Sequence, residues 1–107
     1  MKISENPYWK AVKGTKQVTC SDWHRGWGIG HTKLGNLYKH PEHPDHYVWK
    51  GRSQGRHGQI LVPTKVYLLR ATEEGVTGVW DGNMNEVSTN VLPDFRDIAE
   101  AIRQLNS

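Results

Sequence analysis

The stretch KVYLLRATEEGVTGVWDG, residues 65–82, decides the fold class. Its first part, Lys65 to Ala71, is rich in β-branched, aromatic and aliphatic residues, which favour a strand. Glu73-Glu74-Gly75 is typical of a turn, after which Val76 to Trp80 returns as a second strand. Asp81-Gly82 is a signal for a tight hairpin. The sequence therefore predicts an antiparallel meander that ends in a short strand over Asn83 to Val87.

The residues after this meander predict a helix from Phe95 to Leu105. Asp94 is suited to cap its N-terminus, because an aspartate side chain accepts hydrogen bonds from the first free amides of a helix. Apolar residues recur at helical spacing and form one stripe: Phe95, Ile98, Ala99, Ile102 and Leu105. This stripe predicts that the helix packs on one face of the preceding sheet.

The part of the chain before the meander predicts short strands separated by long loops. Alternation of apolar and polar residues indicates strands over Tyr8 to Val12, Gln17 to Cys20 and His46 to Lys50. Pro41 and Pro44 exclude a helix around residues 39–45. We therefore expect an α+β fold: a small antiparallel β-sheet or partial barrel packed against one C-terminal α-helix, with long central loops at one end of the sheet.

Length, charge and cysteine content bound the class of protein. A chain of 107 residues predicts a single domain, residues 1–107. The formal net charge of +3 favours polyanionic partners. The single cysteine, Cys20, excludes an intramolecular disulfide and fits a reducing cytoplasm. No stretch resembles a signal peptide or reaches the ~20 apolar residues of a membrane span. We therefore expect a cytoplasmic protein with no membrane partner and no cofactor.

The stretch from Trp23 to Gly58 carries the strongest functional signal. It holds all six histidines and three of the five tryptophans, interleaved with lysines and arginines. Cations that bind phosphates and flat rings that stack on bases are what single-stranded nucleic-acid binding requires. We expect a small, non-enzymatic module that binds nucleic acid, single-stranded RNA or DNA, or a protein that handles it. The residues expected to contact nucleic acid are Arg25, Trp27, Lys33, Lys50, Arg52, Arg56 and His57.

Two alternative functions use the histidines chemically. A small ribonuclease or phosphodiesterase needs a base, an acid and a cation, and His31, His57, Lys33 and Arg56 have the required side chains. The run HPEHPDH, residues 40–46, would project three imidazoles on one face of an extended, proline-rich segment. A single extended run rarely closes the ligand shell of a metal, so we expect no metal site here.

A third alternative is a protein-binding accessory factor of a phage or mobile element, the setting in which small chains of this composition are common. Such a factor could form a homodimer through exposed aromatic residues. The same aromatic residues also fit a structural role. Alternation along Tyr47-Val48-Trp49 places one ring in the core whichever way the strand faces.

Overall fold

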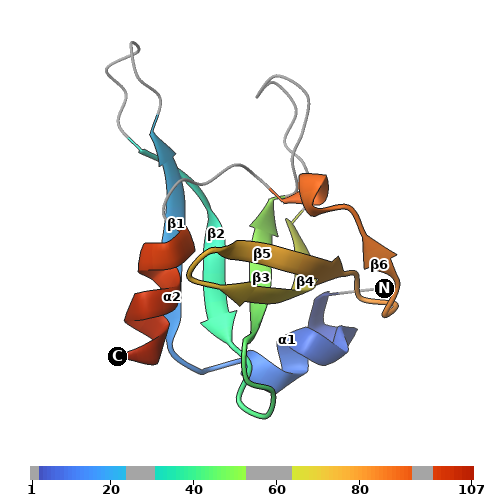
Figure 1. The fold of residues 1–107 in the computed structure, drawn as a ribbon. Helices are drawn as coiled ribbons and strands as arrows, with labels where there is room; N and C mark the ends of the chain where they lie inside the picture. The colour runs from blue at the N-terminus through green and yellow to red at the C-terminus, as the bar shows by residue number, and fades with distance from the viewer. Residues whose placement is uncertain (1–2, 24–30, 53–63, 93–97) are drawn as a thin grey trace.

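The computed structural model describes residues 3–23, 31–52, 64–92 and 98–107, with residues 21–23, 31–34, 52 and 90 described by their backbone alone. Its fold is the predicted α+β class, an antiparallel sheet packed against a C-terminal helix (Figure 1). None of the described helices is long and apolar enough to cross a membrane. In chain order the helices and strands are α1 (Pro7–Val12), β1 (Gln17–Trp23), β2 (His31–Lys39), β3 (His46–Arg52), β4 (Thr64–Thr72), β5 (Gly75–Trp80), β6 (Glu86–Val87) and α2 (Ile98–Asn106), with short 3₁₀ helices over Ile3–Glu5 and Thr89–Val91.

The sheet is an open meander in which the described strands lie in chain order from β1 to β6. Every neighbouring pair is antiparallel. In Figure 1 the β4–β5 hairpin runs across β2 and β3, which shows how strongly the sheet is twisted. Bulges between Cys20 and Ser21 in β1 and between Arg70 and Ala71 in β4 add local bends. The two faces of the sheet pack against different helices.

One face of the sheet forms the larger hydrophobic core with α2. Trp49, Leu37 and Leu69 are fully buried there and pack in one cluster with Ile102 of the helix. Ala101 and Leu105 are also buried, so the apolar stripe faces the sheet as predicted, with Ala101 in the place expected for Ala99. The predicted helix start, residues 94–97, lies outside the described residues.

The other face of the sheet packs against α1, a helix over residues that the sequence analysis assigned to a strand. Tyr8 and Val12 are buried in a second cluster with Val48 and Val66. Residues 8 and 12 share one face of a helix, because they are four positions apart. Asn6 caps this helix: its Oδ1 accepts hydrogen bonds from the backbone N–H groups of Tyr8 (2.9 Å) and Trp9 (3.1 Å). The strand prediction for Tyr8 to Val12 is therefore wrong.

The central segment also contains more strand than the expected long loops. Residues 31–39 form β2, which pairs with both β1 and β3. Gly35 is required at the centre of this pairing. A Cβ atom there would lie 2.5 Å from the carbonyl oxygen of Lys50 and 2.6 Å from Cα of Gly51. Gly35 therefore permits close packing of the two strands.

The expected last strand of the meander is shorter than predicted. Only Glu86–Val87 pair with β5, and residues 81–85 form a turn. The Asp81 carboxylate accepts hydrogen bonds from the backbone N–H groups of Asn83 (2.9 Å) and Asn85 (3.0 Å). An aspartate that bonds its own turn in this way stabilises a wider turn than the two-residue hairpin expected from Asp81-Gly82.

Candidate nucleic-acid interface and two pockets

Two connections of the meander leave the sheet at the same end. Trp23, the last residue of β1, pairs with His31, the first of β2. Arg52, the last residue of β3, likewise pairs with Thr64, the first of β4. Both pairs of strand ends point toward the top of Figure 1. We call this region the basic end and define it as residues 21–36 and 50–65.

The charge of the chain is concentrated in the basic end. These two segments hold six of the fourteen lysines and arginines but one of the eleven acidic residues, Asp22, which gives a net charge of +5. The rest of the chain then carries −2, because the whole chain carries +3. A field of one sign over one end of a small protein attracts polyanions far more strongly than its net charge suggests. The cations concerned are Arg25, Lys33, Lys50, Arg52, Arg56 and Lys65.

The seven predicted contact residues all belong to these two segments, but the structure describes few of their side chains. Arg25, Trp27, Arg56 and His57 lie outside the described residues. Lys33 lies in β2 and Arg52 in β3, each described by its backbone. Lys50 is the one predicted contact whose side chain is described. Of the set, the strand pairing places Lys33, Lys50 and Arg52 at one end of the sheet.

Lys50 contacts an aromatic ring on the α1 face of the sheet. Its Nζ lies 3.9 Å from the ring centroid of Trp9, a cation–π contact. Trp9 in turn meets Tyr38 edge to face, with ring centroids 5.5 Å apart. Lys50 is half-buried in this stack and keeps its charge at the surface. The arrangement combines a cation with a flat ring. Proteins that bind single strands use cations for the phosphates and aromatic rings for the bases.

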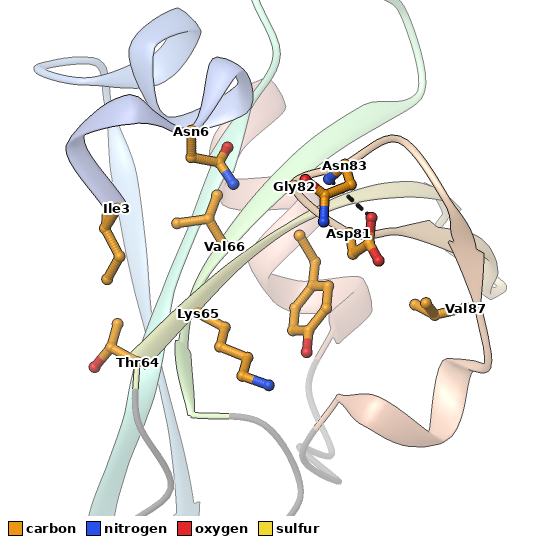
Figure 2. A pocket seen from close by; sticks show the side chains of 10 residues that line it. Ile3, Asn6, Thr64, Lys65, Val66, Asp81, Gly82, Asn83 and Val87 are labelled. Atoms are coloured by element: carbon orange, nitrogen blue, oxygen red, sulfur yellow. Dashed lines mark hydrogen bonds between the residues drawn. The ribbon is translucent and has the colours of Figure 1, made fainter. Parts of the chain in front are cut away.

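A pocket of about 510 Å³ opens beside the basic end, at the edge of β4 (Figure 2). It forms because Leu68 is the first residue of β4 to pair with β5, so residues 64–67 extend past the end of that strand. The 3₁₀ helix at the N-terminus and the 81–85 turn close its sides. We call it the edge pocket; its polar lining comes from Asn6, Thr64, Lys65, Tyr67, Asp81 and Asn83.

The polar groups of the edge pocket offer both charges and a neutral donor. Figure 2 shows the amide nitrogen of Asn6 on the side of the pocket where Asp81 and Gly82 lie. Tyr67 is 5% exposed, and burial together with the nearby Asp81 carboxylate raises the pKa of its phenol. The phenol therefore stays a neutral hydrogen-bond donor at physiological pH, beside the ammonium group of Lys65.

The HPEHPDH run lies in the β2–β3 connection, at the end of the sheet opposite to the basic end. Its three imidazoles are neighbours: the ring centroids of His40 and His43 are 4.6 Å apart, and those of His43 and His46 are 5.6 Å apart. Within the described part of the chain, no group of three or more His, Cys, Asp or Glu side chains is arranged to hold a metal ion. His31 and His57, the histidines of the ribonuclease hypothesis, belong instead to the two sequence segments of the basic end.

Two rings of this run are held in opposite tautomers. Nδ1 of His40 accepts the backbone N–H of Glu42 at 3.2 Å, so a neutral ring carries its proton on Nε2. Nδ1 of His46 lies 2.8 Å from the carbonyl oxygen of Pro44, which can only accept, so this ring carries its proton on Nδ1. Burial and the neighbouring His43 ring lower the pKa of His40, although Glu42 opposes them. In these neutral tautomers, Nε2 of His40 is a donor and Nε2 of His46 an acceptor.

These histidines line a second pocket, of about 520 Å³, between α1, the β2–β3 connection and the 81–85 turn. We call it the histidine pocket. Apolar side chains complete it, among them Tyr8, Leu68, Trp80 and Met84. Met84 is the one large hydrophobic residue that is mostly exposed in the described ranges, at 70%. The sequence analysis missed these partners because they come from segments far apart in the chain.

Cys20 has no place in either pocket. It is buried in the larger core, and burial raises the pKa of its thiol to about 11. A thiol in such surroundings is a packing group rather than a nucleophile.

No protein-family model, no curated protein and no solved structure matches this chain.

Proposed function

We propose that the protein is a binding module for single-stranded nucleic acid and that the basic end is its contact surface. The observation that supports this proposal is the separation of charge. The ends of β1, β2, β3 and β4 lie at one end of the sheet, and the two stretches of sequence that contain these ends carry a net charge of +5 against −2 for the rest. Lysine and arginine that contact phosphates release condensed counterions, and this release drives non-specific binding.

The edge pocket gives the bound strand a place for one nucleotide beside the basic end. Lys65 offers a cation to a phosphate, while Asn6 and the neutral Tyr67 phenol offer hydrogen-bond donors to a sugar or base. The Lys50–Trp9 contact offers a second cation and ring on the neighbouring face. Phosphate contacts supply the affinity in this arrangement, and rings add stacking energy of about 1–3 kcal/mol per base.

The test is a salt titration of binding to a labelled single-stranded RNA and DNA, with the oligonucleotide checked on a gel afterwards. For single strands the slope of log affinity against log salt is about −0.7 per phosphate neutralised, so six engaged cations predict a slope near −4. Replacing Arg52 and Arg56 by alanine should weaken binding and reduce the slope by about 1.4.

The matched control is the Lys10→Ala, Lys13→Ala double variant, which removes the same charge from exposed positions in and just after α1. It should leave the slope nearly unchanged. Equal losses in both double variants would reduce the effect to net charge and overturn the assignment of the basic end. Cleavage of the oligonucleotide would favour the ribonuclease hypothesis, and absence of binding at low salt would favour a protein partner.

A further inference from the structure

The histidine pocket lies at the end of the sheet away from the basic end, and the proposed function does not use it. Its volume of about 520 Å³ is within the range of roughly 300–1,000 Å³ that is usual for small-molecule sites. Such sites are mostly apolar, with a few polar groups that fix the orientation of the ligand. The pocket has this character, because Tyr8, Leu68, Trp80 and Met84 surround the imidazole nitrogens.

The pocket holds two aromatic rings that lie nearly parallel. The rings of His46 and Trp80 stack with an offset, at 26° and with their centroids 6.4 Å apart. Trp80 lies over Gly78, whose missing side chain makes room for it: a Cβ there would be 2.8 Å from the indole. The outer edge of the indole thus lies against the sheet at Gly78, and the ligand proposed below stacks on a face of this ring.

The imidazole nitrogens present one donor and one acceptor. Nε2 of His40 carries a proton and Nε2 of His46 a lone pair, because the Nδ1 atoms of both rings are occupied. His40 and His46 both line the pocket, so their rings border the space that a ligand would fill. A purine or pyrimidine base carries both acceptors and donors on its edge, the two kinds of group that this donor and this acceptor can bind.

Charge excludes a phosphate from the pocket. No lysine or arginine is among the described residues that line it, whereas Glu42 is. The exposed Arg70 is the cross-strand neighbour of His46 but does not line the pocket. An uncharged ring is therefore favoured over a nucleotide.

The backbone is strained on both turns beside the pocket. Asp45 (φ 61°) and Met84 (φ 67°) are the only non-glycine residues with left-handed φ in the described part of the chain. Asp45 directly precedes His46, and Met84 lines the pocket. Left-handed backbone is rare for methionine and concentrates at binding sites, where it fixes a side chain in position.

We propose that the histidine pocket binds an uncharged purine or pyrimidine base, stacked on Trp80 and hydrogen-bonded to His40 and His46. Two sources supply such a ring: a free nucleoside or a base within a strand. Met84 covers the stacked ring from the 81–85 turn. This site does not depend on the basic end, because its ligand needs no phosphate.

The experiment is an NMR titration of the isotope-labelled protein with adenosine, guanosine, cytidine and uridine, each up to about 5 mM, which detects millimolar dissociation constants. A chelator is present throughout, so that trace metal ions bound to the histidines do not cause the shifts. At least one nucleoside should give saturable shifts at residues 40–46, at Met84 and at the Trp80 indole, with an affinity that is insensitive to salt. Trp80→Leu should weaken that affinity at least tenfold. Met84→Gly should weaken it severalfold while it relieves the left-handed backbone strain.

Val76→Ala is the matched control, because Val76 lies in β5 like Trp80 and is partly buried but does not line the pocket. It should retain nucleoside binding. Shifts with nucleosides alone assign a free nucleoside, and equal shifts with an oligonucleotide assign a base within a strand. The proposal is overturned if no nucleoside gives saturable shifts, if the shifts centre on Lys65 and Tyr67, or if the 5′-monophosphate binds more tightly than its nucleoside.

Discussion

At the scale of single residues, Gly35 is the position where the structure tolerates least change. An added Cβ would meet backbone atoms of β3 at 2.5 and 2.6 Å, and backbone cannot move aside as a flexible side chain can. We expect Gly35→Ala to lower the free energy of unfolding by about 2–3 kcal/mol. Urea denaturation of both proteins measures this difference.

Gly14→Ala is the control for this prediction. Gly14 has φ +82°, but a Cβ there would meet nothing within 4 Å, so only backbone strain of about 1–2 kcal/mol applies. Gly35→Ala should be the more destabilising of the two variants. The reverse order would mean that β2 and β3 separate easily at this point and that the close contact is unimportant. The sequence could not indicate this difference, because it depends on a strand fifteen residues later.

At the scale of elements, α1 depends on its cap. Asn6 is 6% exposed and satisfies two backbone N–H groups at the start of a helix that has only six residues. We expect Asn6→Ala to lower the free energy of unfolding by about 1 kcal/mol. Asn6→Asp should lower it much less, because aspartate caps a helix about as well as asparagine. Thermal or urea unfolding compares the two variants. Equal losses would assign the role of Asn6 to packing rather than to capping.

The elements that could be predicted from the sequence are those with a long local pattern. β3, β4 and β5 show alternation bounded by turn residues, and the apolar stripe of α2 has helical spacing over residues 98–105. A segment of six residues such as α1 fits both periods, and tertiary contact with Val48 and Val66 decides between them. The pair Asn6-Pro7 was the available signal, since Asn caps and Pro begins helices.

At the scale of the whole molecule, the sequence analysis grouped the histidines, cations and tryptophans of residues 23–58 as one functional stretch. The antiparallel pairing of β2 and β3 divides that stretch between opposite ends of the sheet. The candidate contact residues rest on sequence and charge and stay a prediction. The two pockets could not, because Trp80, Met84 and Asn6 join them from distant segments through the curvature of the sheet.

The same division predicts different responses of the two sites to pH. His24, His31 and His57 belong to the basic end, whereas His40, His43 and His46 belong to the histidine pocket. From pH 7.5 to 5.5, protonation adds up to three charges to the basic end, so strand affinity should rise and its salt slope steepen by up to about 2. Nucleoside affinity should not rise with it, because burial lowers the pKa of His40 and keeps this ring a neutral donor.

His40 itself should resist protonation in this range, since burial and its neighbour lower its pKa. The folded protein then binds fewer protons than the unfolded chain, so His40 removes stability as the pH falls below its ordinary value of about 6.5. Salt titration with a labelled strand and NMR titration with a nucleoside, each at both pH values, measure the two responses on one preparation. If both affinities moved in the same direction, the histidines would act as one group, and the assignment of two independent sites would be wrong.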